Sequence, residues 1–180
     1  MPPRNGSKRR TAAYGAAETS AGPVLVAVCD GRLVALKFGF AQRDTARAVE
    51  ELHREFGARF GLVADDVGVA PVLKQVRGYL EGRRHRMDVK VDLSSLTPFQ
   101  RDVLLEVARV PRGKVSTYAE IARRIGRPNA YRAVGNALGN NPVPVVVPCH
   151  RVLGSNGIGG FGLGLDVKRR LLALEGVSVD

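Results

Sequence analysis

One of the two cysteines in the chain, Cys149, has neighbours able to activate it as a nucleophile. The stretch "NNPVPVVVPCHRVLG" spans residues 140–154 and places His150 and Arg151 directly after this cysteine. A base and a positive charge close to a thiol lower its pKa and favour the reactive thiolate. The residue types therefore indicate a catalytic cysteine, while the alternative, a small buried apolar side chain, stays open.

The residues before Cys149 predict how it is held. The apolar run 143–147 is typical of a buried strand that ends near the cysteine. Neighbouring side chains of a strand point to opposite faces, so contact between Cys149 and His150 would require a turn or a bridging water. The second cysteine, Cys29, lies within an apolar segment, which indicates a structural role.

The net charge of +11 is unevenly distributed along the 180 residues. Residues 1–22 carry four basic and one acidic side chain, residues 23–92 twelve and ten, and residues 93–180 twelve and six. This excess in the tail and in the C-terminal half favours a polyanionic partner, most simply nucleic acid. A solvated basic surface is the alternative.

Other classes of protein fit the sequence less well. No apolar run reaches the roughly 18 residues of a membrane span, and the N-terminal segment lacks the apolar core of a secretory signal. Free thiols in a reducing cytoplasm are therefore expected. The cysteines and the three histidines, His53, His85 and His150, show no ligand-pair spacing, so we predict no metal site.

The first half of the chain predicts a disordered basic tail over residues 1–22 and a small α/β domain over residues 23–92. Asp30-Gly31, a hairpin-turn dipeptide, would join two strands in "GPVLVAVCDGRLVALKFG". Helical spacing follows in "AQRDTARAVEELHREFG" and in "VLKQVRGYLEGRR". The alternation in "RMDVKVDL" then predicts a half-buried strand.

The second half of the chain has a mostly helical pattern. Thr97 with Gln100, and Thr117 with Glu120, have the spacing of capping boxes at the start of helices in "TPFQRDVLLEVARV" and "TYAEIARRIG". A further helix is expected in "AYRAVGNALGNN", with Asn129 as its cap. Two short helices around a tight turn in a basic region are typical of a helix-turn-helix, and an ordinary helical hairpin is the alternative.

Small residues mark two further segments. "RAVGNALGN" presents one cation, Arg132, among small side chains, which suits close approach to a neighbouring helix or to a nucleic-acid groove.

The loop "GSNGIGGFGLG" fits a dinucleotide-binding pattern at Gly157, Gly159 and Gly162, but the second parallel strand that this pattern requires is not expected after the next helix. We therefore expect a loop that lies against a flat ligand, with Phe161 as a stacking wall, or a loop that is merely flexible.

These segments together resemble the O6-alkylguanine-DNA alkyltransferases, also named methylated-DNA–protein-cysteine methyltransferases. "NPVPVVVPCHRV" is similar to the active-site motif of this family. The resemblance extends through "TPFQRDVLLEVARVPRGKVSTYAEIARRIG", "RAVGNALGNNP", the glycine loop and "KRRLLALEG". It is dense over residues 97–176 and loose over the first half of the chain. The Pro-Cys-His-Arg motif with an upstream Asn-Pro is highly specific.

The resemblance implies a role for individual residues. Cys149 would accept the alkyl group, His150 would act as base through a water molecule, and Glu175 would orient His150. Asn141 would brace the turn between the recognition helix and the active-site strand. Arg132 would fill the space left by the extruded base. Tyr118 would help to rotate the nucleotide and donate a hydrogen bond to guanine. Contacts with DNA would come from Ser116, Thr117, Ala133 and Gly135. The base pocket would be lined by Tyr118, Val152 and Phe161.

The resemblance also implies the fold and the reaction. The N-terminal α/β domain would hold a small antiparallel sheet with helices, ribonuclease H-like, and the mostly α C-terminal domain, residues 93–180, a winged helix-turn-helix-like motif. The protein would bind double-stranded alkylated DNA as a monomer, away from membranes, in the cytoplasm (with the nucleoid of a bacterium, or in the nucleus of a eukaryote). It would flip out O6-alkylguanine and transfer the alkyl group irreversibly to Cys149 without a cofactor. O4-alkylthymine is a further substrate left open.

The glycine loop departs from the family pattern. Phe161 stands where relatives often carry tyrosine, and the loop is one residue shorter than in many of them. Gly162 and Leu163 fall where some relatives have polar residues. These differences affect the range of alkyl groups accepted rather than the reaction itself.

Three rival functions differ from an alkyltransferase in testable ways. A protein that binds alkylguanine without accepting the alkyl group conflicts with the presence of Cys149. A cysteine hydrolase needs a Cys–His pair brought together from distant segments. A helix-turn-helix regulator without chemistry leaves the Pro-Cys-His-Arg motif unexplained.

Overall fold

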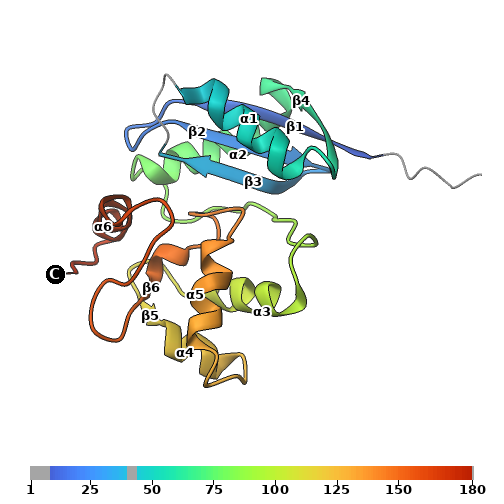
Figure 1. Cartoon of the computed structure of the whole chain (residues 1–180). Helices are drawn as coiled ribbons and strands as arrows, with labels where there is room; N and C mark the ends of the chain where they lie inside the picture. The colour runs from blue at the N-terminus through green and yellow to red at the C-terminus, as the bar shows by residue number, and fades with distance from the viewer. Residues whose placement is uncertain (1–8, 40–43, 180) are drawn as a thin grey trace, which may run out of the picture.

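The computed structural model describes residues 9–39 and 44–179, and the first half of the chain forms a four-stranded sheet (Figure 1). The strands β1 (Arg10–Ala17), β2 (Val24–Cys29), β3 (Arg32–Phe38) and β4 (Phe60–Ala64) lie in the order β3-β2-β1-β4. The neighbours β1 and β2, and β2 and β3, are antiparallel, whereas β1 and β4 are parallel. The sheet is therefore mixed rather than antiparallel as expected, because helix α1 (Thr45–Phe56) carries the chain across it from β3 to β4, and such a crossover joins parallel strands.

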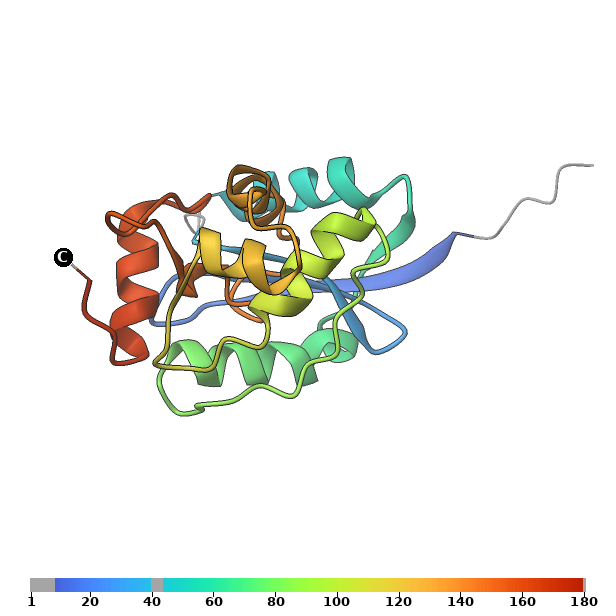
Figure 2. The same cartoon turned by 90° about the horizontal axis from the view of Figure 1, so that it is seen from below.

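The predicted hairpin between β2 and β3 is confirmed. Asp30 and Gly31 have φ values of 49° and 69°, as the two central residues of a type I′ turn require. Strand β2 is buried on both faces, since α1 and α2 (Asp66–Leu80) cover opposite sides of the sheet (Figure 2). Cys29 packs in the apolar cluster on the α1 side and is only 1% exposed.

Two expectations for the first half are wrong. Residues 10–17, which the sequence places in a disordered tail, form β1, because pairing with both β2 and β4 satisfies their backbone groups. Residues 86–93 form no continuous strand; within this segment Val91 makes an isolated bridge to Leu33. Residues 1–8 of the predicted tail, and residues 41–43 at the start of the first predicted helix, lie outside the described residues.

The second half is mostly helical, as predicted. Helices α3 (Pro98–Val107), α4 (Tyr118–Arg124) and α5 (Tyr131–Gly139) pack together below the sheet in the view of Figure 1, and α6 (Leu165–Leu174) lies to one side. Both predicted capping boxes are present, at Thr97 for α3 and at Thr117 for α4. The expected cap of α5 is wrong: its N-cap is Ala130, and no side chain caps it, so Asn129 has no such role.

The apolar run 143–147 is a buried turn and not the expected strand. Val145 has a φ of 73°, and the Val147 amide donates to the Val143 carbonyl at 2.9 Å. Asn141 accounts for the turn, because its Oδ1 accepts from the Val143 amide at 3.0 Å and its Nδ2 donates to the Val147 carbonyl at 2.9 Å. Side-chain bonds of this kind offer the backbone an alternative to sheet pairing.

The two halves of the chain share one core. The Leu36 amide of β3 donates to the Pro142 carbonyl at 2.8 Å, which ties the edge of the sheet to the segment before the turn. A single apolar cluster contains side chains from β2, α2, α3 and α5 and from the turn itself. The turn is therefore held from both sides, and it leads into η2 (Cys149–Arg151), a single 3-10 turn.

Candidate active site

Cys149 lines a cavity of about 890 Å³ to which both halves of the chain contribute. The cysteine is 6% exposed. The 3-10 turn of η2 replaces the extended geometry that would point Cys149 and His150 to opposite faces. Around the cysteine the cavity is lined by predicted site residues from α4, α5, the segment just after α5 and the glycine loop, namely Tyr118, Gly135, Asn141 and Phe161.

Asn141 holds the cysteine as well as the turn. Its Nδ2 donates to the Cys149 Sγ at 3.2 Å, in addition to the bond to the Val147 carbonyl. A hydrogen bond donated to sulfur favours its anionic form. The same side chain that folds the turn therefore also faces the thiol that the turn presents.

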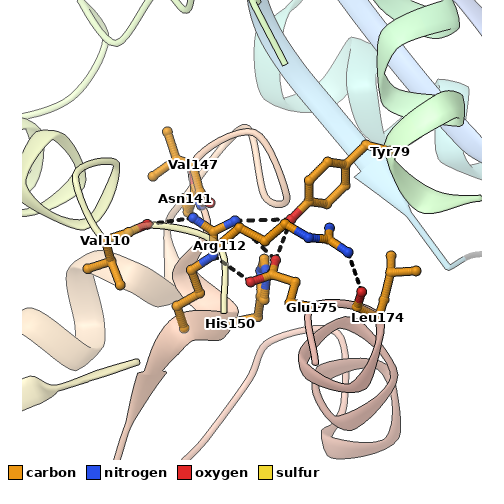
Figure 3. A network of polar contacts seen from close by, with 9 residues as sticks. Tyr79, Val110, Arg112, Asn141, Val147, His150, Leu174 and Glu175 are labelled. Atoms are coloured by element: carbon orange, nitrogen blue, oxygen red, sulfur yellow. Dashed lines mark hydrogen bonds and ion pairs between the residues drawn. The ribbon is translucent and has the colours of Figure 1, made fainter. Parts of the chain in front are cut away.

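The imidazole of His150 is fully buried and points to Glu175, the C-cap residue of α6 (Figure 3). His150 Nε2 lies 2.6 Å from Glu175 Oε1, while Nδ1 has no hydrogen-bond partner within the described chain. Arg151 donates from Nε to Glu175 Oε2 at 2.7 Å and from Nη2 to Oε1 at 3.1 Å. The buried carboxylate is therefore paired with a cation and is hydrogen-bonded at both oxygens, as a buried charge requires.

These contacts set the protonation states. Burial alone would raise the pKa of Glu175, but hydrogen bonds from His150 and Arg151 hold that pKa well below its ordinary value. Burial lowers the pKa of His150, so the ring is neutral at neutral pH. Burial also raises the pKa of the Cys149 thiol, against the opposing effect of Asn141. The lowered thiol pKa expected from the sequence is thus wrong, and thiolate formation requires a base such as the neutral imidazole.

Lys168 is a buried cation beside the site that the sequence analysis missed. Its Nζ donates to the Val152 carbonyl at 2.6 Å and to the Gly160 carbonyl at 3.1 Å. Burial lowers its pKa to about 8, while its positive charge favours the thiolate of Cys149. Lys168 stands three and four residues before the buried Leu171 and Leu172. This spacing places it on the apolar face of α6, and it was the signal in the sequence that could have predicted a buried lysine.

The ring of Tyr118 fits closely between the glycine loop and α5. Its hydroxyl donates to the Gly160 carbonyl at 3.2 Å. A Cβ atom at Gly159 would lie 3.0 Å from a ring carbon of Tyr118, and Gly159 has a φ of 70°. Both the space and the backbone conformation therefore require glycine there, and the loop closes onto a flat aromatic surface.

Some of the other predicted site residues are exposed, and others are buried. Arg132 and Ala133 are exposed on the first turn of α5, with the Arg132 guanidinium 5.7 Å from the ring centroid of Tyr131. The hydroxyl of Ser116 is buried and donates to Glu120 at 2.9 Å. That hydroxyl is therefore used inside the protein.

Two further side chains are also engaged within the chain. The Thr117 hydroxyl caps α4. Val152 is fully buried in β6 (Val152–Leu153), which pairs with β5 (Ser116–Thr117). The Val152 side chain is not among those that line the cavity.

Comparison with known proteins decides the family. A model of the DNA-binding domain of 6-O-methylguanine DNA methyltransferases matches residues 98–177. A methylated-DNA–protein-cysteine methyltransferase of Mycolicibacterium paratuberculosis is 43% identical over 119 residues, which cover 66% of this chain and 72% of that protein. The chain belongs to the methylated-DNA–protein-cysteine methyltransferase family. A Methanosarcina mazei protein of the same name is 46% identical over 105 residues, 58% of this chain and 66% of that protein.

Solved structures of methyltransferases extend the likeness to both halves of the chain. Mycobacterium tuberculosis OGT in complex with DNA matches with a TM-score of 0.74 at 34% identity, over 91% of this chain and 92% of that one. The O6-methylguanine-DNA methyltransferase of Pyrococcus kodakaraensis matches with a TM-score of 0.70 at 28% identity, over 93% and 100%. The family resemblance drawn from the sequence is therefore confirmed, and the chain is a DNA-repair methyltransferase whose acceptor is a protein cysteine.

No helix within residues 9–39 and 44–179 is long and apolar enough to cross a membrane. Over the same ranges, no group of three or more His, Cys, Asp or Glu side chains is arranged to hold a metal ion.

The buried His150 is expected to make the folded protein less stable as pH falls below about 6.5. Because its pKa is lowered in the folded state, an unfolded chain binds a proton there that the folded chain does not. The free energy of unfolding should then fall by up to about 1.4 kcal/mol per pH unit. Urea unfolding at several pH values measures this slope, which His150→Gln should flatten. An equal slope in His150→Gln would contradict the assignment.

Proposed function

We propose that the chain repairs O6-alkylguanine in double-stranded DNA by irreversible transfer of the alkyl group to Cys149. One observation carries the proposal: Cys149 lines a cavity together with the aromatic side chains of Tyr118 and Phe161. Asn141 holds this cysteine, and the His150–Glu175 pair follows it. Its volume of about 890 Å³ lies in the range of small-molecule sites. Cys29 is buried against α1 and has no such surroundings.

The transfer needs a base, a nucleophile and a leaving group. The proton of the Cys149 thiol passes to His150 Nδ1 through a water molecule, and Glu175 orients the ring and stabilises the imidazolium. The thiolate attacks the alkyl carbon, so that a carbon–sulfur bond forms while the bond from that carbon to O6 breaks. The electron pair stays with guanine, which takes up a proton. The thioether is stable, so each chain acts once and without a cofactor.

A base inside a duplex is out of reach of the thiolate and has to be flipped out. We assign α4 and α5 to a winged helix-turn-helix-like motif in which α5 is the recognition helix. The exposed Arg132 and Ala133, with the half-buried Gly135, support this assignment. Arg132 enters the base stack as a finger, while Tyr118 helps to rotate the nucleotide and donates to the guanine. Thr117 contacts DNA from the corner that leads into α4. Ser116 and Val152 are buried and support this corner and the pocket from inside, Ser116 through its bond to Glu120 and Val152 through the bond its carbonyl accepts from Lys168.

The arrangement of the chain supports a finer description of its parts. We propose a boundary near residue 92, with residues 93–180 as the DNA-binding and alkyl-acceptor domain. The N-terminal domain then includes β1 as well as residues 23–92. Its strand order β3-β2-β1-β4, with β1 and β4 parallel, supports a ribonuclease H-like sheet. Every group assigned here lies on one chain, so we propose that a monomer acts, in the cytoplasm or with the genome of its cell.

The test is incubation with duplex DNA that carries O6-methylguanine radiolabelled on the methyl group. We expect one label per chain, on the peptide that contains Cys149. A cysteine hydrolase would release label into solution over many turnovers, and a protein that only binds would retain the DNA and take up no label. Either result would overturn the proposal. A second duplex with labelled O4-methylthymine tests whether that base is also a substrate.

A further inference from the structure

Tyr79 stands at the end of α2, in the sheet-bearing half of the chain, and yet its hydroxyl reaches the acceptor site (Figure 3). The side chain is 2% exposed. The hydroxyl donates to Glu175 Oε1 and accepts from Arg151 Nη2 at 3.0 Å. These two partners are separated from Tyr79 by most of the C-terminal half of the sequence, and the reaction proposed above assigns no task to this tyrosine.

We propose that Tyr79 is a positioning residue for alkyl transfer, which holds the Glu175 carboxylate in the orientation and charge distribution that keep His150 a usable base. The inference rests on the proposed function. With this role, the sheet-bearing half of the chain contributes a side chain to the acceptor site and does not only support the fold.

The geometry at Glu175 Oε1 supports this role. The oxygen lies 2.6 Å from His150 Nε2 and accepts from the Tyr79 hydroxyl as well. Rotation of the carboxylate away from His150 would also break the bond to Tyr79, whose backbone belongs to α2 and not to α6. A carboxylate bonded by donors from separate elements is fixed more firmly than one bonded by donors of its own helix.

Tyr79 is itself held in place. The Arg112 guanidinium lies 5.2 Å from the centroid of its ring, an arrangement that favours a cation. Arg112 also donates to the carbonyl of Leu174, the residue before Glu175. One cation therefore joins the tyrosine ring to the end of α6, so that hydroxyl and carboxylate keep their relative positions.

The hydroxyl also affects the basicity of His150. The charged and titratable groups around this ring are Glu175, Arg151, Lys168 and the neighbouring Cys149. A proton donated by Tyr79 draws negative charge away from Glu175. Without that donor, more negative charge would face His150, and the imidazolium would hold its proton more tightly. A purely packing role for the ring has no such consequence.

The experiment compares Tyr79→Phe with the wild type. Single-turnover transfer from duplex O6-methylguanine is measured between about pH 5 and pH 9, the range in which histidine titrates. Loss of one hydrogen bond to a charged group should lower the plateau rate about tenfold. Because transfer needs neutral His150, the acid limb of the pH profile should also move to higher pH.

Tyr14→Phe is the matched control. Tyr14 lies in β1, its ring packs edge-on against His53 at 5.6 Å, and it borders the apolar cluster on the α1 side of the sheet. Its loss of a hydroxyl should change neither the rate nor the pH profile. Unfolding curves of all variants establish that the proteins compared are folded.

An unmoved acid limb in folded Tyr79→Phe would overturn the positioning role, whether or not the rate falls. If Tyr79→Phe does not fold, Arg112→Met decides instead: it frees the ring and should move the limb in the same direction, and an unmoved limb would again overturn the proposal. Wild-type protein that takes up no label would refute the proposed function itself. Label uptake by the wild type with an unchanged Tyr79→Phe would refute only the role of Tyr79.

Discussion

Cys149→Ser is expected to abolish alkyl transfer while DNA binding stays intact. A serine hydroxyl has almost no anionic fraction at neutral pH, and the site has no second nucleophile in the same position, so the rate should fall on the order of 10⁴-fold or more. The fold should survive, because the hydroxyl is slightly smaller than the thiol and can still accept the Asn141 amide bond. Transfer of radiolabel and binding of an alkylated duplex, both measured on the same preparation, separate the two properties.

Cys29→Ser is the matched control for this result. Cys29 is 1% exposed in β2, and its Sγ lies 3.5 Å from Asp30 Oδ2. The substitution should reduce stability somewhat by burying a hydroxyl, but the folded fraction should still take up one label per chain. Near wild-type transfer in Cys149→Ser, or loss of labelling in folded Cys29→Ser, would show that Cys149 is not the acceptor.

Arg132→Ala is expected to slow repair of duplex O6-methylguanine by about 10- to 100-fold, while reaction with free O6-benzylguanine or a single-stranded oligonucleotide changes little. Extrusion of a base from a duplex costs a few kcal/mol, which a side chain inserted into the stack helps to offset. The exposed Arg132 on the first turn of α5, beside the small Ala133, is placed for this task. The rate of Cys149 alkylation on the three substrates measures it.

The alternatives for Arg132 have distinct outcomes. A simple phosphate contact would weaken binding at all sequences and lower the salt slope by about one, so a duplex defect that low salt fully rescues would exclude the finger role. Equal slowing on all three substrates would indicate a damaged fold. Arg109→Ala is a matched control, because this arginine lies just after the end of α3, is 78% exposed and pairs with Glu106 of that helix.

The comparison with Tyr79→Phe separates two stages of the reaction. Arg132→Ala should act only where a base has to leave a duplex, whereas Tyr79→Phe acts on the base His150 and should slow all three substrates alike. The two variants together therefore test whether flipping and transfer depend on separate parts of the chain.

Local patterns in the sequence determined much of this fold. The capping boxes at Thr97 and Thr117 and the Asp30-Gly31 hairpin could be predicted, because each depends on contacts within a few residues. The Pro-Cys-His-Arg motif likewise sufficed to name the family. Arg132 and Asn141 were named through the same resemblance. The bonds of Asn141 to the turn are observed, whereas the role of Arg132 in base extrusion stays a prediction.

Elements that depend on distant partners were predicted less well. β1 has small, weakly apolar side chains and forms because β2 and β4 lie on either side of it. Helix α2 begins at Asp66 and not near Val72, because Asp65 caps it by accepting from the Gly68 amide, whereas Gly68 and Pro71 suggest a loop. Residues 143–147 have the composition of a strand, but the side-chain bonds of Asn141 fold them into a turn.

The chemistry of the site was decided by the tertiary structure. Arg112 and Lys168 lie in segments that resemble the family, but the sequence does not show that Tyr79, Arg112 and Lys168 meet near Cys149, because their contacts join α2, the segment after α3 and α6. The protonation states depend on burial, and for Cys149 burial reverses the expectation from the sequence. The pKa of the thiol is raised, although His150 and Arg151 follow it. Arg151 is paired with Glu175, and desolvation outweighs the effect of the remaining positive charge. The sequence alone determined which side chains are present, and only the packing of the two halves determined which of them carries a proton.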